Sequence, residues 1–537
     1  MSVKEAARLE GIYTWLEASR KPFDMAIEDI QGLMLPHRME INTQSMAGKQ
    51  RIPASYDSTA ANSADALVNF LSGAVLPSTS DWLKFDIFLG VAEGEVRERL
   101  DIGAEKVLQV MDNSNFYEAG GVSLKDLWVL GNTTWFQEEQ LPSAAGALFG
   151  DDSGFTGFSF EGVQYANMYR HLDRQGNTLV SCRVFPLSQL EAQRFFGDKW
   201  KKTGNPGDPA IVKHFYEREV DGSWTESWLD CDLGRLVGDQ RKNLTFNPYS
   251  SHRLDQVGNE QMGVGRGHIA RPTAAGMNEM RRQMLNATGR SLNTPLVVEN
   301  ESVVRTERGT GGLIVMREAA AFQPFYLRAD VDLAAVDNVF RADTTQVERA
   351  FMSDILLDPD SQPRSAEESR LRQARLQNRI AGPTQVVRRW LSAIVGNIVT
   401  GMVQVGALPE FEGLGAVQPV FSSPFFVAQR QGSIQKVIDF VQLKVALATA
   451  ANDPKILDDI DWDGVSRFLE RNADVPSTVF RDQQQVDAMR RARAETEGIN
   501  QGLEQAALAA SLVGQGQIPN PASATSPEGT VPVEGSI

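Results

Sequence analysis

The stretch SAEESRLRQARLQNRIAGPTQVVRRWLSAIVGNIVTGMVQVGALP, residues 365–409, says most about how this chain folds. It predicts a long helix that opens with a capping box, because Ser365 is followed three residues later by Glu368 and the pair can satisfy two free backbone amides. Proline lacks an amide donor and clashes with the preceding turn, so we expect the helix to bend or stop at Pro383. An apolar stripe at helical spacing indicates that the second half packs on one side. This stripe runs through Val387, Leu391, Ile394, Ile398 and Met402.

The residues before this helix predict two further helices with a small β insert between them. One helical pattern runs from near Pro272 to about residue 293, and another covers residues 331–352; short β runs such as PLVVEN and QPFYL lie in the insert, residues 294–330. Because helices anchor both of its ends, the insert is expected to protrude as a tip. Pro359 and Pro363 exclude regular structure from the following segment, residues 353–364, which reads as a loop.

The rest of the chain changes character twice, and together the segments predict the α+β class. Residues 1 to about 130 are mostly helical; the segment 58–76 carries one apolar face through Ala64, Leu67, Leu71 and Val75. Residues 154–233 alternate with period two and predict an antiparallel β region, with a helix inserted at 188–196. Helices return over residues 433–493, and residues 514–537 have the low-complexity composition typical of disorder.

Length and composition indicate a large protein of several packed units. The chain has 537 residues, 42% hydrophobic and 23% charged, which is ordinary for a soluble protein. Its formal net charge of −16 argues against a protein that coats DNA, although a duplex can slide past an acidic surface. Cys182 and Cys231 lie far apart, which indicates neither a disulfide framework nor a zinc site. The N-terminus is charged from Lys4 and has no secretory signal pattern, so synthesis in a cytoplasm is expected.

One segment matches the spacing of a calcium-binding loop. Asp459, Asp461, Asp463, Gly464 and Glu470 follow the EF-hand pattern D-x-D-x-D-G-x5-E. Position nine of such a loop would be an arginine here, which would place a cation beside the calcium ion. The alternative is an aspartate-rich entry to a helix, where the carboxylates cap exposed amides. A calcium-binding interaction protein using residues 459–470 therefore stays open beside the structural interpretation.

A second alternative concerns residues 390–409, which carry no charge and approach the length of a membrane span. Ser392, Asn397 and Thr400 dilute the segment, and one marginal span in an acidic chain is more typical of a core helix. The alternative function would be a membrane-associated structural protein.

Apart from residues 459–470, no arrangement of residues predicts catalysis, a metal or a cofactor. The glycine clusters at 263–267 and 309–312 lack the lysine and hydroxyl residue of a phosphate-binding loop, so turns are the expected explanation. Neither a HExxH pair nor a GxSxG elbow is present. The histidines are scattered, at His37, His171, His214, His252 and His268.

The order of segments over residues 20–495 resembles the portal, or head-to-tail connector, proteins of short-tailed bacteriophages. The resemblance is carried by YDSTAANSADALVNFLSGAVLPSTSDWLKFDI (56–87), LWVLGNTTWF (127–136), LDRQGNTLVSCRVFPLSQLEAQRFFG (172–197), MGVGRGHIARPTAAGMNEM (262–280), the helix quoted above, SSPFFVAQRQGSIQKVIDFV (422–441) and the segment 459–495. No single motif is diagnostic, but the order of all of them is specific.

The resemblance implies a phage portal fold assembled as a dodecameric ring at one capsid vertex, with a central channel through which double-stranded DNA is packaged and ejected. Its parts would be a wing at 1–262 with a kinked helix and return at 365–421, a stem of helices 263–293 and 331–352, a small α/β clip at 294–330, a tunnel loop at 353–364, a helical crown at 422–497, and a partly disordered C-terminal tail at 498–537.

The implied protein is a virion component, not an enzyme, and has no membrane partner. It would contact other copies of itself, DNA, the terminase packaging motor, a tail adaptor, and capsid and scaffolding proteins. A channel must pass a polyanion without holding it, so an acidic wall with few cations suits it. The DNA-channel candidates are Arg341, Arg349, Asp354, Asp358, Asp360 and Arg364. Contacts of the clip with motor or adaptor are assigned to Arg305, Arg308 and Arg317, and subunit contacts to Arg372, Arg375 and Arg379. For the stem charges, ordinary solvated or intersubunit ion pairs are the alternative.

Overall fold

The structure is a computed structural model of the chain. It describes residues 2–36, 38, 55–88, 95–139, 157–201, 204–258, 260–292, 296–298, 314–315, 325–326, 333–353, 366–411, 413–414, 416–451, 458–462, 464–466, 468 and 488–493. In some helical stretches, notably residues 366–383 and 427–435, the description covers the backbone alone.

Helices dominate the N-terminal part, as predicted. They are α1 (Ser2–Met34), α2 (Thr59–Val75), α3 (Glu95–Asp112) and α4 (Phe116–Leu130). The face of α2 that the sequence marks as apolar is fully buried: Ala64, Leu67, Leu71 and Val75 all lie in the main hydrophobic core. The periodicity of three to four residues is therefore confirmed as a packing signal.

The β region is antiparallel, and it extends past the predicted end at residue 233 to residue 253. Its larger sheet has the order β4-β5-β6-β7-β8, and β9 also pairs with β7. The strands are β4 (Met168–Leu172), β5 (Thr178–Ser188), β6 (Pro209–Arg218), β7 (Trp224–Asp230), β8 (Arg235–Leu236) and β9 (Arg241–Leu244). The predicted inserted helix is α5 (Gln189–Phe196), which Ser188 and Glu191 cap reciprocally.

Smaller sheets and turns connect this region to the helices. A three-stranded sheet has the order β10-β2-β3, built from β2 (Asn132–Glu139), β3 (Phe158–Val163) and β10 (Tyr249–Arg253). Two further sheets have two antiparallel strands each. One pairs β11 (Asp255–Gln256) with β12 (Gly263–Val264), and the other pairs β1 (Leu83–Ile87) with β16 (Val417–Phe421). Single 3-10 turns are η2 (Tyr165–Asn167), η3 (Gly197–Lys199) and η4 (Pro409–Phe411).

Helix α1 ties the sheet to the helical core. Leu9 and Leu16, in its first half, are buried against the six-stranded sheet together with Phe215. Ile30 and Met34, in its second half, belong to the main core. One helix thus contributes to two separate hydrophobic clusters.

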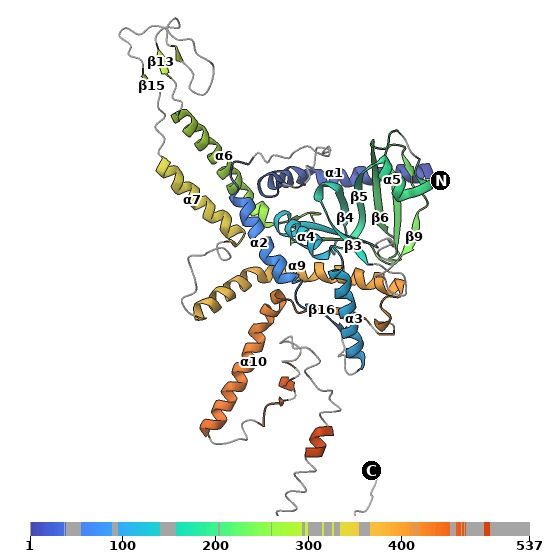
Figure 1. Ribbon diagram of the computed structural model, residues 1–537, viewed down its shortest axis with the longest axis vertical. Helices are drawn as coiled ribbons and strands as arrows, with labels where there is room; N and C mark the ends of the chain where they lie inside the picture. The colour runs from blue at the N-terminus through green and yellow to red at the C-terminus, as the bar shows by residue number, and fades with distance from the viewer. Residues whose placement is uncertain are drawn as a thin grey trace, which may run out of the picture. The chain divides into compact units, whose positions relative to one another are not determined.

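The helix quoted at the start is α9 (Ala366–Val405), and it continues through Pro383 as one 40-residue helix. It does not stop, and its ribbon changes direction partway along (Figure 1), as expected of a helix that contains a proline. The predicted stripe is confirmed, because all five of its side chains lie in the main core. Ser365, the first residue of the predicted capping box, lies outside the described residues.

Two helices pack against each other where the stem is predicted, α6 (Arg266–Leu292) and α7 (Leu333–Ala350). In Figure 1 they run side by side, with strands of a small sheet beyond their far ends. That sheet has the order β14-β13-β15, from β13 (Leu296–Val298), β14 (Ile314–Val315) and β15 (Phe325–Tyr326). Strand β14 is parallel to β13, whereas β15 is antiparallel to it. The predicted helix–β–helix order is confirmed for these described elements.

The sequence predicts that helices return at residue 433. In the structure, helix α10 (Pro424–Ala451) begins earlier, at Pro424. The chain divides into two compact units, residues 1–461 and residues 462–537. The described residues of the second unit form a few short helical segments. The predicted loop beyond Ser353 and the predicted tail at 498–537 lie outside the described residues.

Candidate functional site

The α6–α7 pair carries the stem charges that the sequence singles out. The side chain of Arg341 is 78% exposed, and its Nε donates to Oδ2 of Asp337 at 2.8 Å, one helical turn away. Arg349 is exposed in the last turn of α7. For Arg341 the structure supports the ordinary ion-pair alternative, and such an exposed pair contributes little to stability.

The other candidate residues are placed only in part. Arg372, Arg375 and Arg379 lie in the first half of α9 at spacings of three and four, so they share one face of the helix. The remaining candidates lie outside the described residues: Arg305, Arg308, Arg317, Asp354, Asp358, Asp360 and Arg364.

The root of α6 is built on a glycine seam, which we define as Gly131, Gly263, Gly265 and Gly267. Gly131 ends α4 in the left-handed conformation, φ +77°; Gly263 and Gly265 pass directly beside it, and Gly267 passes beside Val129. A Cβ on Gly263 would lie 2.6 Å from the Gly131 carbonyl oxygen, and a Cβ on Gly267 would lie 2.6 Å from that of Val129. Real Cβ atoms essentially never approach backbone so closely.

The seam corrects the sequence prediction for residues 263–267. Turns were expected there, but none of these three glycines adopts a left-handed φ. They are required because two backbone segments touch, and any side chain would separate them. The cluster is also unlike a phosphate cradle, because the space in front of it is filled by the end of α4.

Asn132 bonds across the seam. Its Nδ2 donates to the carbonyl oxygens of Leu130 and Gly263, both at 3.1 Å. Its Oδ1 accepts from the Gly263 amide and from Nη2 of Arg170, both at 2.9 Å. One buried amide group thereby joins the end of α4, the approach to α6 and strand β4.

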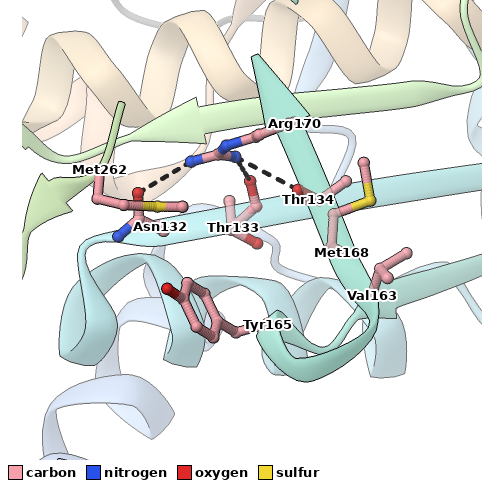
Figure 2. A pocket seen from close by; sticks show the side chains of 8 residues that line it. All are labelled: Asn132, Thr133, Thr134, Val163, Tyr165, Met168, Arg170 and Met262. Carbon is pink, nitrogen blue, oxygen red and sulfur yellow. Dashed lines mark hydrogen bonds between the residues drawn. The ribbon is translucent and has the colours of Figure 1, made fainter. Parts of the chain in front are cut away.

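Arg170 is the centre of this network, which Figure 2 shows. Its side chain is nearly inaccessible, at 6% exposure, and Nη1 donates to Thr133 O at 3.1 Å and to Thr134 Oγ1 at 3.3 Å. Burial, with a smaller contribution from the charge of Arg253, lowers the pKa of Arg170 to about 10. The group remains cationic at neutral pH, and these partners are neutral oxygens, so its charge is stabilised by dipoles.

The cavity beside Arg170 is too small for a ligand. It measures about 20 Å³ and is lined in part by Val163, Tyr165, Met168 and Met262. That volume accommodates about one water molecule. The network is therefore structural, and it holds the strand that supports the seam.

Further bonds fix the first turns of α6. Nδ1 of His268 accepts from the Gly265 amide at 3.2 Å, and burial lowers the pKa of His268, which keeps the ring neutral for that role. Oδ1 of Asn278 accepts from the Tyr56 amide at 2.6 Å. These contacts could not be predicted from the sequence, because each joins residues that are distant along the chain or depends on which side of α6 is buried.

Asp459, in the candidate calcium loop, accepts from Nζ of Lys444 at 3.2 Å. This ion pair gives the Asp459 carboxylate a partner within the chain. Asp463 and Glu470 lie outside the described residues. Among the residues that are described, no group of three or more His, Cys, Asp or Glu side chains is placed to hold a metal ion.

One described helical segment, Thr384–Val405, is long and apolar enough to cross a membrane. Its apolar stripe packs in the main core, where Trp390 lies against Trp135 with ring centroids 6.2 Å apart. The helix therefore has partners within the chain itself, as expected of a core helix.

Comparison with known proteins adds one finding. A search of curated proteins gives no match. A family model described as bacteriophage head to tail connecting protein matches residues 6–480. This range includes both hydrophobic clusters to which α1 contributes, the α6–α7 pair and α10. The chain therefore belongs to the bacteriophage head to tail connecting proteins, which are structural components of the virion at the capsid vertex.

Proposed function

We propose that this connector is the portal of its phage: a dodecameric ring through which double-stranded DNA is packaged and ejected. The observation that carries the proposal is the α6–α7 pair, which is rooted in the main core and has a small sheet between its far ends. Ala270, Ala274 and Met277 of α6 are buried in that core, as are Val347 at the end of α7 and Phe351 just after it. A rooted pair of helices of this kind suits the wall of a channel made from several copies.

The outer surfaces of this pair are incompletely covered within one chain. Ile269 and Leu285 of α6 and Val339 of α7 are exposed apolar side chains. In a ring, the neighbouring copies would cover such residues, and each copy would use two different surfaces to do so. The glycine seam supports this arrangement, because ring closure requires every copy to hold its stem at the same angle.

The charges of α7 suit a channel for a polyanion. Helix α7 carries Asp337, Asp343 and Glu348 against Arg341 and Arg349, a difference of one negative charge, and Asp337 and Arg341 form an ion pair. Strong phosphate binding requires an excess of lysine and arginine, which would retain the DNA. A nearly balanced helix allows weak and reversible contact.

The remaining parts are assigned from the resemblance to portal proteins. We place the clip at residues 294–330, with Arg305, Arg308 and Arg317 toward the packaging motor and then the tail adaptor. Residues 353–364 would narrow the channel, with Asp354, Asp358, Asp360 and Arg364 beside DNA. Arg372, Arg375 and Arg379 would bridge neighbouring copies. Capsid and scaffolding proteins would surround the ring, which would be assembled in the host cytoplasm.

Negative-stain microscopy of the purified full-length protein tests the ring. We expect circular particles with a central hole and twelvefold averages. A protein that stays monomeric at high concentration, with and without scaffolding protein, would overturn the proposal.

A deletion tests the channel. Removing residues 354–364 spares Ser353, whose Oγ donates to the carbonyl oxygen of Glu348. We expect such rings to assemble normally but to package or retain less genome. Normal packaging and retention by this variant would refute the role of the loop.

A further inference from the structure

A buried histidine connects two sheets of the β region. His214, on β6 of the six-stranded sheet, is 2% exposed, and its Nδ1 lies 2.8 Å from the hydroxyl oxygen of Tyr249. Tyr249 belongs to β10, in the three-stranded sheet that also contains β2. The tyrosine is buried in a small hydrophobic cluster with residues of both sheets. We define the sheet joint as His214 with the buried members of this cluster, Phe136, Val163, Met168, Tyr216 and Tyr249.

The hydrogen bonds of His214 fix the position of its proton. Oε1 of Glu226 lies 3.0 Å from Nε2 of His214, and it also accepts from Nε1 of Trp228 at 2.9 Å. Burial alone would raise the pKa of Glu226, but the bonds from His214 and Trp228 outweigh burial and lower it. An ionised carboxylate only accepts, so Nε2 of His214 carries the proton and Nδ1 accepts from the hydroxyl of Tyr249.

A second proton on the ring would disrupt this arrangement. It would occupy Nδ1 and meet the hydroxyl proton of Tyr249, which would have to turn away. Among the described residues, Tyr249 has no second acceptor for that proton, and a buried donor without an acceptor is costly. The neutral form of His214 therefore connects the two sheets, whereas the charged form would leave a buried group of the sheet joint unsatisfied.

The surroundings of the ring oppose the charged form on balance. Burial has the largest effect and lowers the pKa of His214; Arg183 on β5 and Arg241 on β9 lower it further, and Glu226 on β7 raises it. The Trp228 ring, stacked on His214 with centroids 3.6 Å apart, would favour a cation. The other titratable groups around the sheet joint are the hydroxyls of Tyr216 on β6 and Tyr249 on β10, Glu138 on β2, and Glu161 on β3, which is bonded to Arg183.

We propose that His214 is a proton-sensitive connection between the two sheets: the neutral ring holds β6 against β10, and protonation opens the sheet joint. In the open state water would hydrate the charged ring and accept the hydroxyl proton of Tyr249. The inference concerns a single copy of the chain and does not rest on the proposed function.

The ordinary pKa of histidine sets how strongly acid should favour the open state. His214 is expected to titrate near 6.5 when it is exposed, and its pKa is lower when the sheet joint is closed. Because the open state binds the proton more readily, acid shifts the equilibrium toward it. With a closed form that stays neutral, the open population should rise about tenfold from pH 7.5 to pH 5.5.

Methionine oxidation measures this opening in the unmodified protein. Met168 lies in the sheet joint and is 4% exposed, Met111 is buried in the main core, and Met25 is 76% exposed. Hydrogen peroxide converts accessible methionine to its sulfoxide, and peptide mass spectrometry gives the rate at each residue. Relative to Met25, the rate at Met168 is expected to rise about tenfold from pH 7.5 to pH 5.5, whereas the rate at Met111 should not change.

Three variants assign the effect to His214. Glutamine does not titrate, so oxidation of Met168 in His214→Gln should be independent of pH. His171→Gln is the matched control, because His171 is on the same sheet and also lies against a tryptophan, and it should keep the tenfold rise. Tyr249→Phe retains the packed ring but removes the hydroxyl, and it should speed oxidation of Met168 already at pH 7.5.

Four results would overturn the proposal. The first is a constant Met168 rate in the unmodified protein, and the second is a pH-dependent rate in His214→Gln. The third is an equal rise at Met168 and Met111, which would indicate acid unfolding of the whole chain. Circular dichroism shows whether each variant is folded; should His214→Gln fail to fold, Tyr249→Phe decides, because an unchanged Met168 rate at pH 7.5 would be the fourth.

Discussion

Substituting Gly265 by alanine should disrupt the root of α6. The added carbon would lie 2.7 Å from the Val129 carbonyl carbon and inside 3.0 Å of both the Gly131 nitrogen and the Val129 oxygen. The widest of these three contacts, at 2.7 Å, already falls 0.7 Å short of the 3.4 Å at which ordinary contact begins, so the two segments would have to separate by more than that. All three contacted atoms are backbone, and no side chain can rotate away.

The expected cost is large for a single methyl group. Overpacking typically lowers the free energy of unfolding by about 1–3 kcal/mol. Because the added methyl group meets backbone on both sides, we expect the upper value, about 3 kcal/mol. Separation would also strain the Gly265–His268 and Asn132–Gly263 hydrogen bonds, each of which contributes about 1 kcal/mol. We therefore expect a loss of about 3–5 kcal/mol.

Urea unfolding followed by tryptophan fluorescence measures this loss, because the buried Trp128 lies next to Val129. Gly276→Ala on the same helix is the control: no atom lies within 4 Å of its Cβ, so it should stabilise the chain by about 0.5–1 kcal/mol. If the two variants unfold at the same urea concentration, the close backbone approach at the seam is wrong.

Three further predictions follow from buried groups. Arg170→Met should destabilise the chain by about 3 kcal/mol, measured as a lower urea midpoint, because it leaves buried oxygens without a donor. Burial raises the pKa of Asp126 to about 6, so the folded state favours the protonated form, and stability should rise as the pH falls through 6 toward the unfolded value near 4. From pH 7 to pH 5 the wild type should therefore gain roughly 1 kcal/mol relative to Asp126→Asn, and equal midpoint shifts would contradict this. Ile394→Ala, in the buried stripe of α9, should lower the free energy of unfolding by about 3 kcal/mol. Val403→Ala, at an exposed position on the same helix, should lower it by less than about 0.5 kcal/mol. Similar losses in urea unfolding would refute the one-sided packing of α9.

Local patterns predicted local structure well. The stripes of α2 and α9 were readable because a helix repeats every 3.6 residues, and the neighbours of each stripe need not be known to see it. The Asp337–Arg341 pair follows from spacing alone, since residues four apart meet on a helix. The start of α6 was misplaced because Pro272 suggested a first turn, whereas the helix already begins at Arg266.

Long-range contacts were not readable in the same way. The need for glycine at residue 265 comes from Gly131, and nothing near either position identifies the other. Arg170 is an ordinary arginine in the sequence, and only the fold surrounds it with the oxygens of residues 132–134. For the same reason, the sequence marked exposed stem arginines as candidates and missed the buried arginine that supports the stem.

The pairing of β1 with β16 has a consequence for biosynthesis. Leu83 lies opposite Phe421, so β1 can pair only after the ribosome has made residues 417–421. The main core likewise contains residues from Ile27 to Phe426. A nascent chain that lacks α9 and β16 would expose the apolar surfaces that these elements cover, and exposed surfaces of this kind promote aggregation. The main core can therefore close only after residue 426 has been made, and a product truncated before that point lacks part of the core.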